Sequence, residues 1–329
     1  MISDKLKQLL NTLADGRFHS GTELASLLGI SRSAVWKQLS ALSEFGIELL
    51  AVSGKGYRLK FPLQLLDKQL INGFLASPVR PLLGELEIHD QIHSTNTHLL
   101  EMARQGADSG AVCLAEQQTA GKGRRGRIWV SPFGHNIYLS ILWRFQGGPA
   151  AITGLSLAMG VAVVRALMGF GITDIGLKWP NDIHWRQRKL AGILIEVSGE
   201  SSGPCHAVIG LGLNVFLPRH EGQGIEQDWV DLYSIVGETI HGRRNRLAGE
   251  ILNQLLPVLA EYETRTLEQY LEEWRGYDCM RGKQVELFMN EHVFSGVVAG
   301  IDDQGLLLLK QADGLIRAFA SGEVSFRRL

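Results

Sequence analysis

The chain has 329 residues and a formal net charge of −1 at pH 7, and 45% of its residues are hydrophobic and 20% charged. This composition excludes a disordered or fibrous chain, and the length favours two or three domains. No apolar run approaches the roughly 18 to 20 residues of a membrane span, so we expect a cytoplasmic protein without membrane contact.

Three helical patterns and a hairpin open the chain. The first pattern follows Ser3, the second follows the capping-box pair Ser20 and Glu23, and the third follows Ser31. The alternating residues that come next surround a basic turn at 53–56, which predicts a hairpin. Three helices followed by a hairpin are typical of a winged helix-turn-helix.

The third helical pattern has one apolar face, formed by Val35, Leu39 and Leu42. Its other face is polar, and together with a lysine in the hairpin it suits contacts with a DNA groove and with phosphates. A helical cap without any nucleic-acid role would show the same apolar face and is the alternative. The candidate DNA-binding residues are Ser33, Trp36, Lys37 and Ser40 on the helix and Lys55 in the hairpin.

A change of pattern at Phe61-Pro62 marks the first domain boundary. We expect a winged helix-turn-helix domain over 1–62, a mixed α/β domain over 63–275 and a small β domain over 276–329. Helical patterns in the α/β domain cover 154–168 and 247–274. Its strand patterns cover 85–88, 111–115, 136–142, 192–197 and 207–212, and those of the β domain cover 284–288, 293–301, 305–310 and 315–320.

The three cysteines, Cys113, Cys205 and Cys279, are widely separated in the sequence. An odd number without the close spacing of metal ligands predicts neither a disulfide framework nor a zinc site. We therefore expect reduced cysteines with a structural role.

A basic, glycine-rich stretch runs from Gln118 to Arg127. Its glycines allow the backbone to approach a ligand closely, and its basic side chains supply positive charge, which suits a polyanion. The stretch matches neither the P-loop pattern nor the dinucleotide-binding glycine pattern. Taken alone, it fits a solvated loop or a nucleic-acid contact as well as a nucleotide site.

Three further segments carry polar groups next to expected strands. Residues 178–182 combine a cation, a tryptophan and a carboxylate around a proline, and residues 188–192 lead directly into an apolar strand. Residues 210–214 end another strand with two glycines and an asparagine, which suits close approach of a ligand or a bulge. Lys189 fits a pocket at the sheet, although a solubilising lysine at a strand start is the ordinary alternative.

The order of these segments resembles one known family, the biotin protein ligases. With the winged helix-turn-helix in front, the chain looks like the bifunctional bacterial form of that family, the biotin ligase and biotin operon repressor. The resemblance covers essentially the whole chain, and five ordered motifs are more specific than any one of them. The motifs are Ser94-Thr95-Asn96, Gln118 to Arg127, Lys178 to Asp182, Arg188 to Gly192 and Gly210 to Asn214.

This resemblance implies an α+β multidomain fold. It has an N-terminal winged helix-turn-helix, a central α/β domain of the biotin/lipoate ligase type with a mixed sheet, and a C-terminal SH3-like β-barrel. The implied activity has two steps and uses biotin, ATP and Mg²⁺. The biotin carboxylate first attacks ATP to give biotinyl-5′-AMP and pyrophosphate, and a lysine of a biotin carboxyl carrier protein then accepts the biotin.

The resemblance also implies roles for single residues. Lys189 and Arg124 would be the catalytic cations, because negative charge develops in each step. Asp182 is a candidate Mg²⁺ ligand, and Trp229 is either an adenosine contact or an ordinary core residue. The implied biotin contacts are Ser94, Thr95, Asn96, Gln118, Lys122, Gly123, Arg124 and Lys189, and the implied ATP contacts are Gly121, Arg127, Lys178, Asn181, Asp182, Asn214 and Trp229.

Two positions depart from the family pattern. Lys122 stands where many members have arginine and loses the bidentate donors of a guanidinium, which favours a role for its backbone. Ser321-Gly322-Glu323 resembles the family's C-terminal glycine-rich turn, with serine in place of the first glycine.

The implied partners are the biotin carboxyl carrier protein, operator DNA and a second copy of the chain, in a homodimer promoted by biotinyl-5′-AMP. The strand that ends near Glu196-Val197 is a candidate contact for both protein partners, if it lies at a sheet edge. Two alternatives remain open at this point. One is a lipoate or octanoate protein ligase, and the other is a ligand-sensing transcription factor without catalysis.

Overall fold

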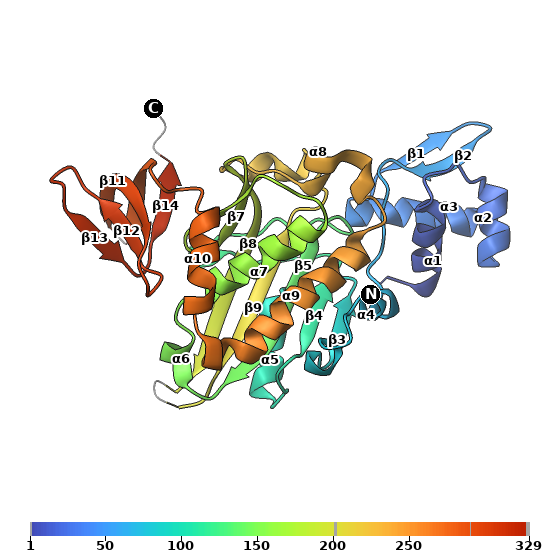
Figure 1. Cartoon of the computed structure of the whole chain (residues 1–329). Helices are drawn as coiled ribbons and strands as arrows, with labels where there is room; N and C mark the ends of the chain where they lie inside the picture. Colours follow the sequence, from blue (N-terminus) through green and yellow to red (C-terminus); the bar gives the residue numbers. More distant parts are fainter. Residues whose placement is uncertain (1, 201–202, 290, 327–329) are drawn as a thin grey trace.

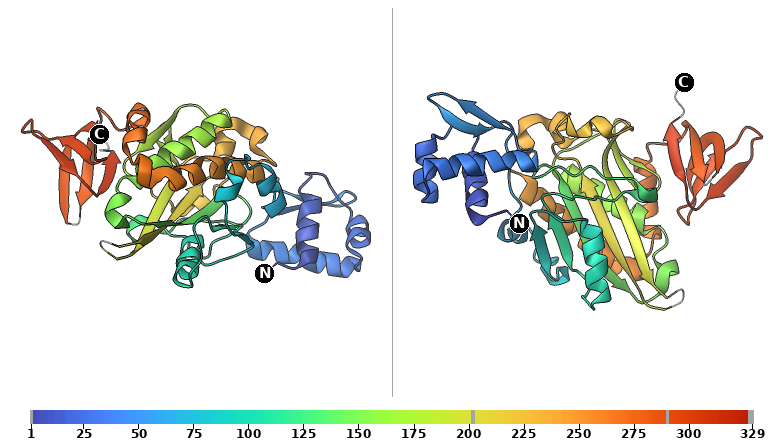
Figure 2. Two further views of the ribbon diagram at one scale, coloured as in Figure 1. Left: turned by 60° about the horizontal axis from the view of Figure 1, so that its bottom comes forward. Right: turned by 180° about the vertical axis from the view of Figure 1, so that it is seen from behind.

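Three structural units lie in a row in the computed structural model, which describes residues 2–200, 203–289 and 291–326 (Figure 1). The N-terminal unit of three helices and a hairpin lies at one end, and the C-terminal sheet lies at the other. The largest unit, a sheet with helices on both faces, lies between them (Figure 2). In the described part of the chain, no helix combines the length and the apolar character that crossing a membrane requires.

The N-terminal unit confirms the predicted helices and their caps. Ser3 and Ser31 each accept a hydrogen bond from the backbone three residues on, and Ser20 and Glu23 form a complete capping box. Gly56 has a φ of +103°, and a Cβ there would lie 2.0 Å from a backbone oxygen of His19. The elements are α1 (Asp4–Leu13), α2 (Gly21–Leu28), α3 (Arg32–Ala41), η1 (Leu42–Phe45), β1 (Leu49–Val52) and β2 (Gly56–Leu59).

One residue from the central unit completes the apolar core of the N-terminal unit. Phe133 is 1% exposed and belongs to the same cluster as the buried leucines of α1 and α2. Its ring centroid lies 5.3 Å from that of Phe45 in η1. Phe133 lies six residues beyond the basic loop that ends at Arg127, so this loop and the N-terminal core are joined by a short stretch of chain.

The central sheet has seven strands in the order β3-β4-β5-β9-β8-β7-β6. Only β3 and β4 run parallel, and all other neighbours are antiparallel, so the predicted mixed sheet is confirmed. The strands are β3 (Leu86–His89), β4 (Val112–Ala115), β5 (Ile137–Phe145), β6 (Ile175–Lys178), β7 (Asp182–Trp185), β8 (Arg188–Gly199) and β9 (Cys205–Leu213).

Helices cover both faces of this sheet. The nearly all-apolar α7 (Leu155–Gly169) and the long α9 (Arg244–Arg265) pack on one face, and α5 (Thr95–Arg104) covers the other (Figure 2). The expected helix over 247–274 is wrong in one respect. It is two helices, because Thr266 adopts a positive φ of 48° and separates α9 from α10 (Glu268–Tyr277). The shorter helices are α4 (Lys68–Gly73), α6 (Gly148–Ala151) and α8 (Leu232–Val236).

The strand expected over 192–197 is longer than predicted, since β8 begins at Arg188. It has β9 on one side and β7 on the other, but its pairing with β7 covers only Arg188–Gly192. Among the described strands, the part of β8 beyond Ile193 therefore has a single neighbour. This geometry supports the expectation of an accessible edge near Glu196.

The C-terminal unit is a five-stranded antiparallel sheet in the order β13-β12-β11-β10-β14, where an SH3-like barrel is expected. It contacts the central unit through the backbone oxygen of Gly305, which accepts a hydrogen bond from Trp179 Nε1 at 3.0 Å. The strands are β10 (Gln284–Met289), β11 (His292–Ile301), β12 (Leu307–Lys310), β13 (Ile316–Phe319) and β14 (Glu323–Phe326).

A buried ion pair fixes the segment that connects the N-terminal unit to the sheet. Arg244 Nη1 lies 2.9 Å from Glu116 Oε2, and the two side chains are 5% and 3% exposed. The other oxygen of Glu116 accepts from Leu66 N–H, and the guanidinium also donates to the carbonyls of Gln64 and Asn136. Each charged group is thus hydrogen-bonded as well as paired, which burial of charges requires.

Candidate active site

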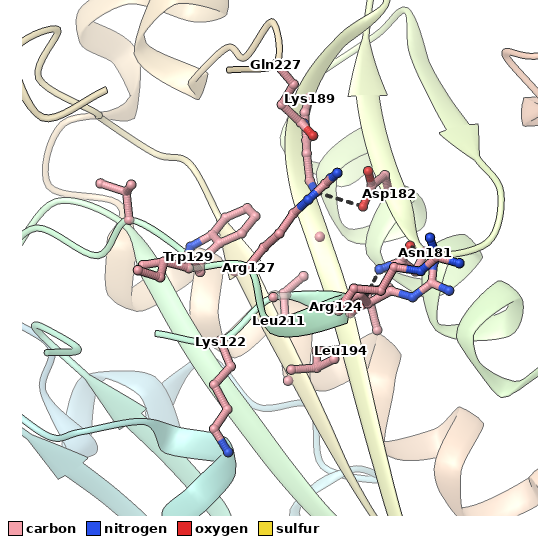
Figure 3. Close-up of a pocket in the computed structure, with 18 of the residues that line it drawn as sticks. Lys122, Arg124, Arg127, Trp129, Asn181, Asp182, Lys189, Leu194, Leu211 and Gln227 are labelled. Atoms are coloured by element: carbon pink, nitrogen blue, oxygen red, sulfur yellow. Dashed lines mark hydrogen bonds and ion pairs between the residues drawn. The ribbon is translucent and has the colours of Figure 1, made fainter. Parts of the chain in front are cut away.

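A cavity of about 840 Å³ lies between the sheet and the basic loop, within the size range of sites for small molecules (Figure 3). The loop 122–130 covers it from one side, and strands β8 and β9 form its floor. Segments from all parts of the central unit and from β14 contribute. The lining segments are 94–96, 122–130, 178–182, 192–194, 210–212, 224–227 and 323–325, with Gln118, Leu139, Lys189, Asn214 and Trp229.

The most polar part of the cavity is an ion pair on neighbouring strands. Lys189 Nζ on β8 lies 2.9 Å from Asp182 Oδ1 on β7, as Figure 3 shows. Burial opposes ionisation of Asp182, but the charges of Lys189 and nearby groups outweigh it and hold the pKa of this carboxyl below its ordinary value. The pair keeps an ammonium group fixed inside the cavity, where it can stabilise a bound anion.

A hydrogen-bonded network lines the opposite part of the cavity. Gln118 Oε1 accepts from the backbone N–H of Thr95 at 2.9 Å, and Gln118 Nε2 donates to Ser131 at 3.1 Å. Ser140, on β5, lies 2.7 Å from Thr95 Oγ1 and 2.6 Å from Asn96 Oδ1. Because their neighbours fix these amide and hydroxyl groups, the network can recognise a small uncharged polar group.

The glycines of β9 have a different role from the close ligand approach that their spacing suggests. A Cβ at Gly210 would lie 2.2 Å from Asn96 Oδ1, and a Cβ at Gly212 would lie 2.3 Å from the indole of Trp129. The glycines therefore make room for two side chains of the cavity. Trp129 also carries a buried Nε1 without a hydrogen-bond partner among the described residues.

The basic loop is fastened to the C-terminal unit and to the turn at 179–181. Arg124 donates to Asn181 Oδ1 at 3.1 Å and to the carbonyl of Gly322 at 3.3 Å, and Arg127 lies 2.5 Å from Glu323 Oε1. Burial lowers the pKa of Arg124. The turn around Gly322, which differs from the family pattern at Ser321, thus holds the loop in place over the cavity.

Lys122 and Gly121 occupy different positions from the other loop residues. The side chain of Lys122 points away from Lys189 in Figure 3, and its Nζ lies 3.7 Å from Glu196 Oε1. Gly121 does not line the cavity, which corrects its expected contact with ATP. A Cβ there would lie 2.5 Å from the backbone oxygen of Trp129, so Gly121 allows the two ends of the loop to pack together.

The expected nucleotide contacts Asn214 and Trp229 lie side by side at one end of the cavity. Asn214 is buried and donates from Nδ2 to the carbonyl of Val230 at 3.1 Å. The ring of Trp229 packs on Gly222, where a Cβ would lie 2.3 Å from it. Trp229 is therefore both a packing residue and part of the cavity wall.

The structure brings almost all the expected site residues into this one cavity. Sequence reasoning missed several others, among them Ser140, whose place inside an apolar strand was the available hint. The expected residues that line the cavity are Ser94, Thr95, Asn96, Gln118, Lys122, Gly123, Arg124, Arg127, Lys178, Asn181, Asp182, Lys189, Asn214 and Trp229, and the missed ones include Trp129, Leu194, Leu211, Gln227 and Glu323.

The expected DNA contacts lie on the surface of the N-terminal unit. Trp36 on α3 is 64% exposed, which is unusual for a tryptophan in a helix of a small unit. The other candidates are also exposed, and Lys55 lies in the turn between β1 and β2. They are Ser33, Lys37 and Ser40 on α3.

Three family models match this chain, one for each structural unit. The HTH domain model matches residues 5–58, and the model of the Biotin/lipoate A/B protein ligase family matches residues 88–214. The model of the Biotin protein ligase C terminal domain matches residues 282–327. Their order along the chain is the order expected from the motifs.

Two curated relatives are similar over nearly the whole chain. Bifunctional ligase/repressor BirA of Salmonella typhimurium is 41% identical over 97% of this chain and 96% of its own length. That of Escherichia coli is 40% identical, with the same two shares. The solved structure of biotin protein ligase from Aquifex aeolicus in complex with biotin and ATP is 26% identical with a TM-score of 0.63, covering 75% of this chain and all of that one.

Proposed function

Since the chain belongs to the family of bifunctional biotin ligases and repressors, we propose that its central cavity makes biotinyl-5′-AMP from biotin and ATP. The enzyme then transfers the biotin to a lysine of a biotin carboxyl carrier protein, and the N-terminal unit represses biotin synthesis genes. The observation that carries the enzymatic part is the buried Lys189–Asp182 pair inside a cavity covered by a basic loop.

The two ends of the cavity suit the two substrates. The network of Thr95, Asn96 and Gln118 offers fixed donors and acceptors to the uncharged ureido ring of biotin. The cationic end around Lys189 suits the biotin carboxylate and the α-phosphate that it attacks. The biotin contacts are Ser94, Thr95, Asn96, Gln118, Lys122, Gly123, Arg124 and Lys189, and the ATP contacts are Arg127, Lys178, Asn181, Asp182, Asn214 and Trp229.

Lys189 and Arg124 are the catalytic residues in this proposal. Attack of the carboxylate on the α-phosphate accumulates negative charge on the phosphoryl oxygens and on the departing pyrophosphate. A cation held by a buried partner stabilises that charge without having to reorganise, which is the source of much enzymatic rate enhancement. The loop 122–130 excludes water from the mixed anhydride, which would otherwise hydrolyse.

Mg²⁺ accompanies ATP in this proposal, and Asp182 is the residue that would meet it. A carboxylate oxygen is the ligand type that Mg²⁺ prefers, and Asp182 is kept ionised by its cationic neighbours. The ion would neutralise part of the triphosphate charge. Asp182 has a second task in any case, because it orients Lys189.

The protein partners are the carrier protein and a second copy of this chain. The part of β8 beyond Ile193 has one strand neighbour and an exposed Val197, so it can add a strand from either partner. A two-fold dimer, promoted by biotinyl-5′-AMP, would place two N-terminal units on two operator half-sites. These partners place the protein in the cytoplasm, with domain boundaries at 62/63 and 275/276.

The enzymatic proposal is tested by ATP–pyrophosphate exchange. We expect radioactive pyrophosphate to enter ATP when biotin is present, and not when biotin is omitted or replaced by lipoate or octanoate. Exchange with lipoate instead of biotin would support a lipoate ligase, and no exchange with either acid would support a ligand sensor without catalysis. Transfer of labelled biotin to a carrier domain completes the measurement.

Replacing Lys55 with alanine tests the proposed DNA contact. We expect weaker binding to a fragment carrying the promoter of the biotin synthesis genes, with biotinyl-5′-AMP present. Losing one phosphate contact should reduce the dependence of log affinity on log salt concentration by about 0.9 per subunit. The exposed Lys68 in α4 is the matched control, and its alanine variant should bind like the parent. No retarded complex with the parent chain would mean that the module no longer binds DNA.

A further inference from the structure

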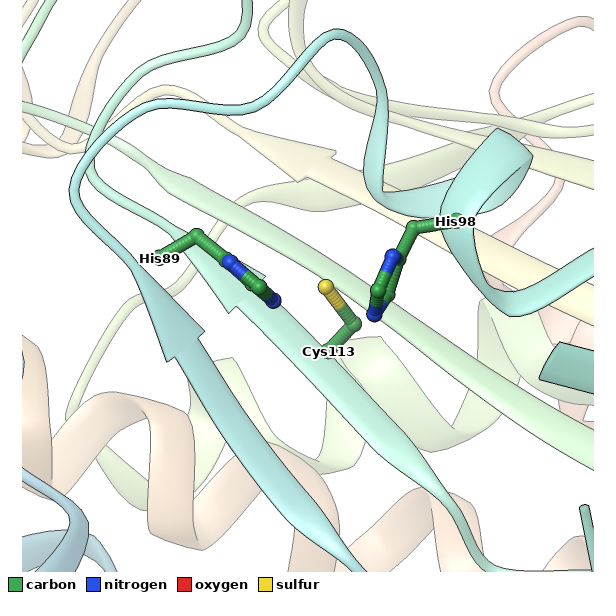
Figure 4. A group of neighbouring side chains, drawn as sticks. All are labelled: His89, His98 and Cys113. Atoms are coloured by element: carbon green, nitrogen blue, oxygen red, sulfur yellow. The ribbon is translucent and has the colours of Figure 1, made fainter. Parts of the chain in front are cut away.

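A second group of reactive side chains lies outside the cavity, on the face of the sheet that α5 covers. His89 at the end of β3, His98 in α5 and Cys113 in β4 point toward one another in Figure 4. One ligand atom from each, an imidazole nitrogen or the sulfur, lies within 4.8 Å of the other two. Cys113 is completely buried, whereas the two histidines are about one third exposed.

Register and spacing explain why these groups meet. Cys113 is the direct partner of Glu87 in the parallel pair β3–β4, so the two side chains emerge on the same face. His89 follows Glu87 by two residues and lies on that face too. Glu87 Oε2 accepts from His89 Nε2 at 2.8 Å and from His98 Nε2 at 2.7 Å, so one carboxylate holds both rings.

The convergence of two imidazoles, a thiol and a carboxylate is the ligand chemistry of a bound transition metal. We propose that His89, His98 and Cys113 form a Zn²⁺ site, with Glu87 or a water molecule as the fourth ligand. Neither the chemistry of the central cavity nor the proposed function depends on this site.

The distances are compatible with this proposal. Zn–N and Zn–S bonds of about 2.0 to 2.3 Å place tetrahedral ligand atoms roughly 3.3 to 3.8 Å apart, so side-chain shifts of roughly half an ångström would close the site. Charge also balances, because a thiolate and a carboxylate neutralise the two charges of the ion. The exposed edges of the histidines provide a path for entry.

The alternative is a hydrogen-bonded cluster in which Glu87 satisfies both histidines and no ion binds. That arrangement gives the thiol no task, since its hydrogen bond, to the carbonyl of Leu114, is long, with a sulfur–oxygen distance of 3.9 Å. Sequence spacing alone could not indicate the site, because its ligands come from three separate elements. The two readings differ in one measurable property, the binding of a thiophilic metal.

The experiment uses the full-length chain without an affinity tag, freed of metal by a chelator and titrated with Co²⁺. We expect one equivalent to produce the near-ultraviolet charge-transfer absorption of a Co²⁺–thiolate bond, and Zn²⁺ to abolish it. The Cys113→Ser variant should lose this absorption, and His98→Gln should weaken metal binding at least tenfold. Zn²⁺ should raise the unfolding temperature of the parent but not of His98→Gln.

Cys205→Ser is the matched control, since Cys205 is also a buried free cysteine but lies on β9, outside the group. It should keep both the absorption and the affinity. The proposal is overturned if the parent shows no charge-transfer absorption, or if His89→Gln and His98→Gln bind Zn²⁺ as tightly as the parent. The histidine variants decide the outcome even if Cys113→Ser fails to fold. Biotin-dependent exchange, measured in parallel, reports on the central cavity separately.

Discussion

Replacing Lys189 with alanine should lower biotin-dependent ATP–pyrophosphate exchange by roughly 100- to 1,000-fold. The side chain is a fixed cation, 2.9 Å from Asp182, and removing one oriented group that stabilises transition-state charge typically costs about that much. The loss should affect both the rate at saturating substrates and the affinity for biotin, because the ammonium meets the carboxylate before and during the reaction.

Two comparisons isolate this effect from a loss of structure. Arg188→Ala changes the neighbouring cation of the same strand, which is exposed and stacks on Trp185 outside the cavity, and it should retain nearly full exchange. Lys189→Ala combined with Asp182→Asn removes the carboxylate that the single variant leaves unpaired. If the single variant keeps near-normal exchange, the role assigned to Lys189 is wrong.

Replacing Arg244 with methionine should destabilise the protein by about 3 to 5 kcal/mol. The change leaves Glu116 as a buried charge without its cation, and an unpaired buried charge costs that much in other proteins. It also removes the donor for the carbonyls of Gln64 and Asn136. The measurement is the free energy of unfolding from urea titration, followed by tryptophan fluorescence.

Arg246→Ala is the control for this change. Arg246 lies in the same helix but is half exposed, 3.9 Å from Glu250, and its loss should cost about 0.5 kcal/mol or less. Adding Glu116→Gln to Arg244→Met should restore part of the stability, because it neutralises the stranded charge and keeps an acceptor for Leu66 N–H. Equal stability of the parent and Arg244→Met would contradict the importance of this ion pair.

Local sequence patterns predicted most of the N-terminal unit. Its helices begin at Ser3, Ser20 and Ser31, because a side-chain oxygen there can satisfy the free N–H groups of the first turn without help from distant residues. Most of the cavity was also predicted, since its motifs are short segments whose residue types follow from the chemistry.

What the sequence did not predict depends on contacts between distant segments. Ser140 is recognisable as a site residue only once Thr95 and Asn96 lie against it. Trp129 looks like an ordinary aromatic residue until Gly212 opens space for its ring. The short strands β6 and β7 were missed because four residues around a tight turn carry too little periodicity.

Phe133 gives the fold a mechanical property that neither activity alone would require. The stretch of about a dozen residues from Gly121 to Phe133 begins in the cover of the cavity and ends in the apolar core of the DNA-binding unit. A ligand that displaces the start of this stretch changes the packing at its end. By reciprocity, DNA that favours one packing of Phe133 must alter the affinity for biotinyl-5′-AMP by the same factor. The chain can thus carry information between its two substrates in both directions.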